Sequence, residues 1–294
     1  MEQTSAKLVN DAIRAMIYEV SVNPKPGLVD PVSSGPHPDM DVFLFIDSAL
    51  SLHHYFEQSV DLGMNFTATD LTLMFKKLRT FGIEAEKTMF KATNGVNTHK
   101  GAVFSLGVLT CAEAYRIKHP QLDLTTIVKR MLKGLTASDY DIEKLHAKPV
   151  EQLTAGEKEF LRYGIKGIRG EAEAGYPTVM QIGVPALKKS QGTTMQRLLD
   201  TFMHIVAQTE DTNLIKRAGR HDVVEEAHQQ AKRYLELGGT QTQAGRDYLA
   251  RLSQEYLLNN YSLGGSADLL ILTIFIGLRQ GILRPEATQS EGMI

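Results

Sequence analysis

The chain has 294 residues, of which 43% are hydrophobic, so it can bury a sizeable core. Its formal net charge of −2, without a ladder of basic and aromatic residues, excludes a typical nucleic-acid-binding protein. A single cysteine, Cys111, excludes both an intramolecular disulfide and a Cys/His zinc site.

Two further features bear on location. The N-terminus, Met1 to Ser5, lacks the basic and apolar pattern of a signal peptide, and the strongest apolar run, residues 269–278, is too short to cross a bilayer. We therefore expect a soluble, cytoplasmic protein without a membrane partner. Cys111 falls on the apolar face of a predicted helix, where we expect a buried structural thiol.

Helical periodicity begins at the N-terminus and dominates the whole chain. Leu8, Ala12, Met16 and Val20 line one face of a first helix, which ends at the prolines of residues 23–27. The loop that follows holds Lys25 on a stiff backbone.

The next helix is predicted to start with Asp39 as its cap and Asp41 in its first turn, and to continue to about His53. A third helical region covers residues 69–90.

The central stretch, residues 93–105, follows this third region and opens an apolar helix. Thr98 is a suitable N-cap, which places His99 and Lys100 in the first helical turn. Cationic side chains at the positive end of a helix dipole are unfavourable unless an anion is near, so we predict a phosphate or pyrophosphate site. A plain helix–turn–helix connection with a solvated lysine is the alternative. The stretch is not a P-loop, because Lys100 precedes Gly101 and a helix precedes the loop.

The second half of the chain is also predicted to be helical. Capping-box spacing occurs at Thr154 with Glu157 and at Asp222 with Glu225. No strand-like alternation rises above noise, and we predict one all-α domain of about ten helices over residues 1–294. The helices expected here cover residues 125–135, 140–145, 193–207, 222–238 and 242–258, and the stretch 262–268 opens a last, apolar helix that continues to about residue 282.

Polar, glycine-bearing loops interrupt this apolar frame at five places, although a helical bundle needs only short, plain connections. Their cations and carboxylates suggest a nucleotide polyphosphate with a metal. The basic candidates for phosphate oxygens are Lys25, Lys100, Arg169 and Arg217, and the acidic candidates for Mg²⁺ or for a general base are Asp39, Asp41, Asp211 and Asp268. The five loops cover residues 25–41, 94–100, 169–173, 211–217 and 264–268.

A rival interpretation is a metal-dependent nucleotide phosphohydrolase with scattered ligands, for which His204, His221, Asp222 and Asp268 are available. The capping box explains Asp222 without a metal. A third interpretation is a non-catalytic helical module that binds coenzyme A or a nucleotide.

The loop motifs resemble the triphosphoribosyl-dephospho-coenzyme A synthase family. The most specific are His37-x-Asp39-Met40-Asp41 and Gly95-Val96-Asn97-Thr98-His99-Lys100-Gly101, and Arg169-Gly170-Glu171-Ala172 and Asp211-Thr212-Asn213 add support. The resemblance covers most of the chain, from residue 24 to residue 270.

This resemblance implies an all-helical transferase that uses ATP and 3′-dephospho-coenzyme A. The 2′-hydroxyl of the acceptor attacks C1′ of the ATP ribose, adenine leaves, and the triphosphate is retained. The product, 2′-(5″-triphosphoribosyl)-3′-dephospho-CoA, would pass to an acyl-carrier holo-synthase that serves citrate lyase or malonate decarboxylase. An oligomer is compatible with the sequence.

Combined with the resemblance, the loops give a set of candidate site residues. The catalytic candidates are Asp41, Asp211 and Asp268, and the candidates for Mg²⁺ bound with ATP are Asp39, Asp41 and Asp211. The candidates for substrate or phosphate binding are Lys25, Asn97, His99, Lys100, Arg169, Arg217 and Ser266.

Overall fold

The computed structural model describes residues 2–284. Within this range it contains helices and no strand, so the all-α prediction is confirmed, but sixteen α-helices exceed the expected ten. The helices are α1 (Glu2–Ser21), α2 (Val42–Ser51), α3 (His53–Asn65), α4 (Thr72–Ala92), α5 (Lys100–Lys118), α6 (Leu124–Met131), α7 (Leu135–Asp139), α8 (Ile142–Ala147), α9 (Ala155–Tyr163), α10 (Gly167–Glu173), α11 (Val184–Lys189), α12 (Thr194–Val206), α13 (Thr212–Ala218), α14 (Val223–Glu236), α15 (Gln243–Leu258) and α16 (Gly264–Arg279).

The extra helices arise from short segments and from one break. The helix expected from Asp39 to His53 divides at the fully buried Leu52 into α2 and α3. A π-helical turn, Thr178–Gly183, connects α10 with α11, and a 3₁₀ turn, Val150–Gln152, connects α8 with α9. The single-domain assignment for residues 1–294 stays a prediction.

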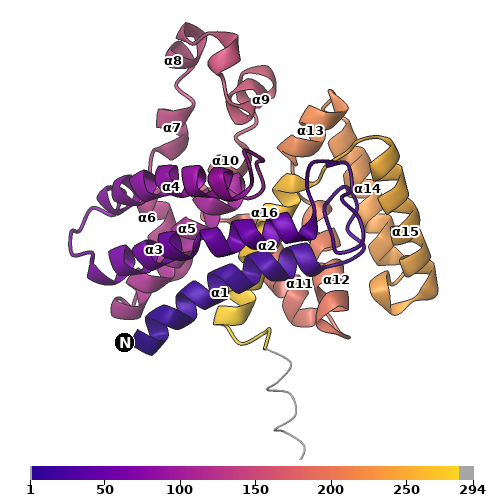
Figure 1. The fold of residues 1–294 in the computed structure, drawn as a ribbon, viewed down its shortest axis with the longest axis horizontal. Coiled ribbons are helices and arrows are strands. Elements are labelled where there is room, and N and C mark those ends of the chain that lie inside the picture. Colours follow the sequence, from indigo (N-terminus) through magenta and orange to yellow (C-terminus); the bar gives the residue numbers. More distant parts are fainter. Residues whose placement is uncertain (1, 285–294) are drawn as a thin grey trace, which may run out of the picture.

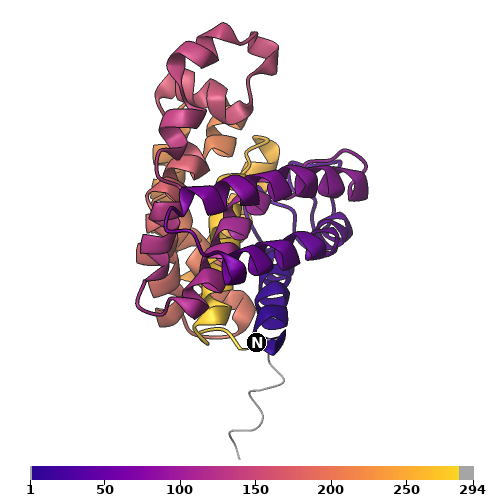
Figure 2. The same cartoon turned by 90° about the vertical axis from the view of Figure 1, so that its left-hand side faces the viewer.

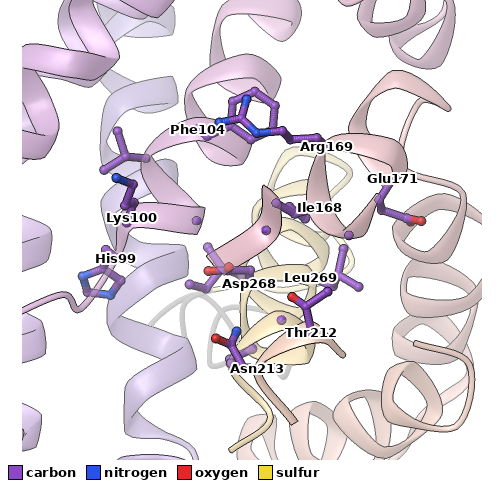
Figure 3. Close-up of a pocket in the computed structure, with 18 of the residues that line it drawn as sticks. His99, Lys100, Phe104, Ile168, Arg169, Glu171, Thr212, Asn213, Asp268 and Leu269 are labelled. Atoms are coloured by element: carbon purple, nitrogen blue, oxygen red, sulfur yellow. The ribbon is translucent and has the colours of Figure 1, made fainter. Parts of the chain in front are cut away.

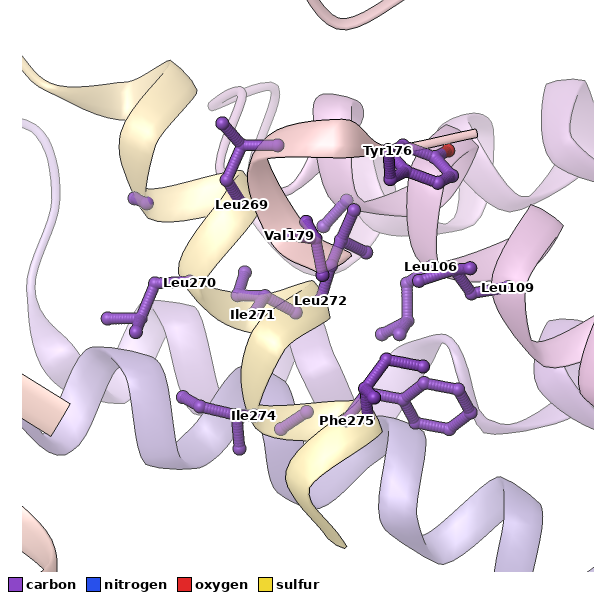
Figure 4. Close-up of a cluster of buried hydrophobic side chains, with 14 of the residues drawn as sticks. Leu106, Leu109, Tyr176, Val179, Leu269, Leu270, Ile271, Leu272, Ile274 and Phe275 are labelled. Carbon is purple, nitrogen blue, oxygen red and sulfur yellow. The ribbon is translucent and has the colours of Figure 1, made fainter. Parts of the chain in front are cut away.

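Helix α16 lies at the centre of the molecule, between α1 and α5 on one side and α11 and α12 on the other (Figure 1). Its residues from Leu269 to Leu278 are all buried, as is typical of a helix that is apolar on every side. Figure 4 shows α16 side chains packed near Leu106 and Leu109 of α5 and near Tyr176 and Val179. This core fixes the start of α16 relative to the start of α5.

Two sequence predictions concern this core. Cys111 of α5 is buried and free, which confirms a structural thiol, and burial raises its pKa. No helix within residues 2–284 is long and apolar enough to cross a membrane.

The segment from α7 to α9 projects from one end of the helical body, at the top of both ribbon views (Figures 1 and 2). Its predicted capping box is confirmed, because Thr154 and Glu157 bond each other's backbone N–H groups. The other predicted box is absent, since Asp222 makes no side-chain cap bond and pairs with Arg220 at 3.0 Å instead. Tyr140 stacks on Phe160 within the projecting segment, with ring centroids 4.5 Å apart.

Candidate active site

A pocket of about 1180 Å³ lies beside the start of α16. Its lining comes from elements far apart in the chain, including α1, α4, α5, α10, α13 and the projecting segment (Figure 3). Pockets for one small molecule have volumes of roughly 300–1,000 Å³. The volume lies above this range, so the pocket has more room than one ordinary small molecule fills.

Asp268 forms part of the floor of this pocket, in the first turns of α16. Within residues 2–284 no hydrogen bond or ion pair reaches its carboxylate. The carboxylate lies directly against the start of α5, because a β-carbon on Gly101 would be 1.9 Å from its Oδ2 and 2.8 Å from its Cγ. The glycine at position 101 therefore makes room for Asp268, which explains a residue of the central motif that the sequence left without a role.

The environment of Asp268 changes its acidity. Burial raises its pKa to about 8, and the negative charges of Asp211 and Glu19 add to the effect. A carboxyl with a pKa near neutrality is suited to proton transfer at physiological pH.

The same shift predicts how stability depends on pH. Between the ordinary pKa of 3.8 and about pH 8, the native state binds a proton that the unfolded chain has released, so stability falls as the pH rises. Asparagine does not titrate, so Asp268→Asn should not lose stability in this way. Its Tm should therefore exceed that of the native protein by a margin that grows between about pH 5 and about pH 8. Thermal melts of both proteins test this, and a margin independent of pH would mean that the carboxyl titrates at its ordinary value.

Asp211 was predicted to be catalytic and to bind metal, but it is 1% exposed and does not line the pocket. Its Oδ1 accepts hydrogen bonds from the backbone N–H groups of Asn213, Leu214 and Gly265, and its Oδ2 accepts from both the N–H and the hydroxyl of Ser266. Both oxygens are therefore used to join the starts of α13 and α16. Ser266, a predicted substrate contact, is buried in this same junction.

Cationic side chains also line the pocket. Arg79 of α4 and Arg169 of α10 both bind the carboxylate of Asp139, with Arg79 Nη1 2.9 Å from Oδ1. The Arg169 guanidinium also lies 5.4 Å from the ring centroid of Phe104. Two guanidiniums that share one carboxylate leave a net positive charge, and such pairs are well suited to phosphate oxygens.

Lys100 also lines the pocket and is about half exposed. Its Nζ lies 3.0 Å from Glu86 of α4, and an ion pair at this exposure contributes little to stability. The Lys100 side chain can therefore exchange Glu86 for a phosphate at low cost. Asn97 accepts a hydrogen bond from the Lys100 backbone N–H at 3.3 Å and so helps to start α5.

His99 lines the pocket but does not carry the positive charge that the sequence suggested. It is 2% exposed, and burial, aided by the nearby Lys25 charge, lowers its pKa to about 3. Its Nδ1 lies 2.8 Å from the Ser48 hydroxyl, and its Nε2 has no partner among the described residues. The predicted cap is also wrong. His99 itself is the N-cap, because the Thr98 hydroxyl bonds Ser48 at 2.7 Å instead.

Lys25, predicted to bind phosphate, does not line the pocket and is 3% exposed. Its Nζ donates to the side chain of Glu19 in α1 and, at 2.6 Å, to the Glu19 carbonyl oxygen. Glu19 does line the pocket. Lys25 therefore orients Glu19, which in turn lines the pocket.

The other candidates lie outside the lining. Asp39 and Asp41 are exposed, and Asp41 is itself the N-cap of α2, accepting from Leu44 N–H at 2.8 Å, so the predicted cap at Asp39 is wrong. Arg217 binds Asn260 at 2.8 Å and lies 3.1 Å from Nδ1 of His37, which does line the pocket.

The predicted metal ligands are not brought together. Within residues 2–284, no group of three or more His, Cys, Asp or Glu side chains is placed to hold a metal ion. This result also removes the geometric basis for the rival phosphohydrolase, whose His221 bonds Glu210 at 3.0 Å.

Sequence reasoning missed several lining residues, among them Glu19, Arg79 and Lys166. Glu19 and Arg79 lie inside predicted helices, where a charged residue ordinarily marks a solvated face. Only the packing of α1 and α4 against the starts of α5 and α16 brings them to the pocket.

Three comparisons with known proteins bear on this site. A family model described as ATP:dephospho-CoA triphosphoribosyl transferase matches residues 5–285. A protein of Lactiplantibacillus plantarum, named as a probable 2-(5″-triphosphoribosyl)-3′-dephosphocoenzyme-A synthase, is 62% identical over 276 residues, which cover 94% of this chain and 98% of the relative.

More distant relatives carry similar names. A synthase of Escherichia fergusonii is 37% identical over 92% of this chain and 89% of its own length. A probable synthase of Streptococcus equi subsp. zooepidemicus is 39% identical over 92% of this chain and 96% of its own length. No solved structure matches the chain.

Proposed function

The chain belongs to the family of ATP:dephospho-CoA triphosphoribosyl transferases, and we propose that its pocket transfers the triphosphoribosyl group of ATP to the 2′-hydroxyl of 3′-dephospho-CoA. The protein is accordingly an enzyme of the transferase class. The products are 2′-(5″-triphosphoribosyl)-3′-dephospho-CoA and adenine.

One observation carries the assignment of the reaction to this pocket. The unpartnered carboxylate of Asp268 occupies the floor, while Arg79, Arg169 and Lys100 line another part of the same large cavity. A glycosyl transfer between two polyphosphorylated substrates needs both features. Cations hold the phosphates, and a carboxylate without a cationic partner is free to act on the sugar.

Asp268 is the proposed general base. It takes the proton of the 2′-hydroxyl as the new C–O bond forms at C1′ of the ATP ribose and the C–N bond to adenine breaks. The bonding electrons leave with adenine, which takes up a proton, so the overall proton count balances. A carboxylate near C1′ also stabilises the positive charge that develops on the sugar.

Asp211 and Gly101 position this base. Asp211 holds the first turn of α16, and Gly101 leaves space at the start of α5. Both residues thus act through Asp268.

We also propose that Mg²⁺ binds together with the phosphates of ATP. The predicted ligand set of Asp39, Asp41 and Asp211 does not fit, because the first two are exposed outside the pocket and the third is fully used by helix starts. Bound with ATP, the ion would neutralise phosphate charge and would keep several waters.

The assay for this function measures adenine released from ATP with and without dephospho-CoA. We expect release only when both substrates are present, and no free phosphate or pyrophosphate. A nucleotide phosphohydrolase would release phosphate, and a non-catalytic binding module would release neither adenine nor phosphate.

The triphosphoribosyl-dephospho-CoA formed by the transferase would then serve an acyl-carrier holo-synthase acting for citrate lyase or malonate decarboxylase.

Lys100→Ala should raise the ATP concentration needed for half-maximal rate about tenfold, because one charge-assisted hydrogen bond to phosphate is lost. Helical circular dichroism should not change, since the pair with Glu86 is half exposed. Lys87→Ala is the matched control, because Lys87 pairs with Glu84 at 2.7 Å on the exposed face of the neighbouring α4. Equal ATP requirements in the two variants would remove Lys100 from the site.

A further inference from the structure

The buried pair of Lys25 and Glu19 adds a second carboxylate to the pocket floor. Glu19 is 3% exposed and lines the pocket, and its Oε1 is bound by the Lys25 ammonium. Within residues 2–284 no hydrogen bond reaches its other oxygen, Oε2. Glu19 therefore has one oxygen held in place and one available to a ligand.

Glu19 and Asp268 belong to the same part of the floor, although they come from opposite ends of the chain. Glu19 lies near the end of α1 and Asp268 near the start of α16, and these two helices pack against each other, with Asp11 of α1 bonded at 3.0 Å to Arg279 at the far end of α16. The charge of Glu19 is also one of the causes that raise the pKa of Asp268. Lys25 is 3% exposed and does not line the pocket. The pocket lining thus offers two carboxyl groups to the ligand.

Such a floor suits hydroxyl groups and disfavours phosphate. A carboxylate is an acceptor only, so it pairs with sugar hydroxyls, as acidic residues do at the ribose of bound dinucleotides. A phosphate in place of the hydroxyl would bring its anionic oxygens against the free oxygen of Glu19 and would leave that acceptor without a donor.

We propose that Glu19 accepts a hydrogen bond from the 3′-hydroxyl of the acceptor ribose and thereby makes the pocket select dephospho-CoA over CoA. This inference rests on the proposed function. If Asp268 takes the proton of the 2′-hydroxyl, the neighbouring carboxylate faces the adjacent carbon of the same ring. In CoA that carbon carries a phosphate, which would meet the charge of Glu19. Glu19 is then a specificity-determining residue, and Lys25 orients it.

Equilibrium binding of dephospho-CoA and of CoA to the full chain tests this without turnover. The native protein should bind dephospho-CoA at least about thirtyfold more tightly than CoA, and Glu19→Gln should narrow that ratio at least about tenfold. The double variant Glu19→Gln/Lys25→Met removes both buried charges, and it should narrow the ratio similarly while keeping the fold.

Glu171→Gln is the matched control, because Glu171 also lines the pocket and its Oε1 accepts from Thr178 N–H at 2.6 Å. It should leave the ratio within a few-fold of native. An unchanged ratio in both Glu19 variants would overturn the proposal, as would equal binding of the two acceptors by the native protein.

Loss of ATP affinity with an unchanged acceptor ratio would mean that Glu19 faces the other ribose, which also overturns the proposal. The adenine assay on the native protein separates this failure from failure of the proposed function. Adenine release with an unchanged ratio refutes only the role of Glu19.

Discussion

Asp268→Asn is expected to lower the rate of adenine release about 10²–10⁴-fold, the usual contribution of a positioned proton acceptor. Asparagine keeps the shape of the side chain but cannot take a proton. The carboxylate makes no hydrogen bond or ion pair within residues 2–284, so the fold does not depend on it. Burying a neutral amide in place of a group whose pKa is raised to about 8 should leave the Tm equal or higher.

The rate of adenine release and the Tm of Asp268→Asn, measured on one preparation, distinguish a catalytic role of Asp268 from a structural one. Asp61→Asn on the exposed face of α3 is the matched control and should be silent in both. Activity of Asp268→Asn within a few-fold of native would contradict the catalytic role.

Gly101→Ala is expected to reduce turnover about 10²-fold, because a displacement of about 1 Å at a reacting group can cost that much. The added methyl group would lie 1.9 Å from Oδ2 of Asp268, so the carboxylate must move. The obstacle is the end of a flexible side chain rather than backbone, so the Tm should change little. The affinity for ATP should also stay near the native value.

The control is Gly82→Ala, also in a helix. Its new β-carbon would meet only the Tyr55 hydroxyl, at 3.6 Å, so the better helix propensity of alanine should raise stability by about 0.5–1 kcal/mol. Full activity in Gly101→Ala would mean that the position of Asp268 is not critical.

Periodicity was enough to predict an all-α fold and its long helices, because an apolar face every 3.6 residues must be buried. It was not enough to predict the division at Leu52 or the short helices of the projecting segment. Leu52 ends α2 and starts α3, but it is as apolar as its neighbours in the sequence. The break in the helix at Leu52 therefore comes from tertiary packing.

Part of the pocket lining was also predicted from the sequence. Loop composition pointed to Asn97, Lys100, Arg169 and Asp268, which all line the pocket. The sequence alone could not reveal which groups each charged side chain bonds in the folded protein. Asp211 and Lys25 lie in the predicted loops but bind other protein groups. Asp211 accepts hydrogen bonds from the start of α16, and Lys25 forms an ion pair with Glu19. Glu19 itself lies in a regular helix, where nothing in the local pattern separates it from a surface residue.

The mass of the acceptor product tests the central claim most directly. After incubation with ATP, dephospho-CoA should gain one triphosphoribosyl group for each adenine released, and an acceptor that lacks the 2′-hydroxyl should gain none. Transfer to the 2′-deoxy acceptor, or a product that carries fewer than three phosphates on the added ribose, would contradict the account.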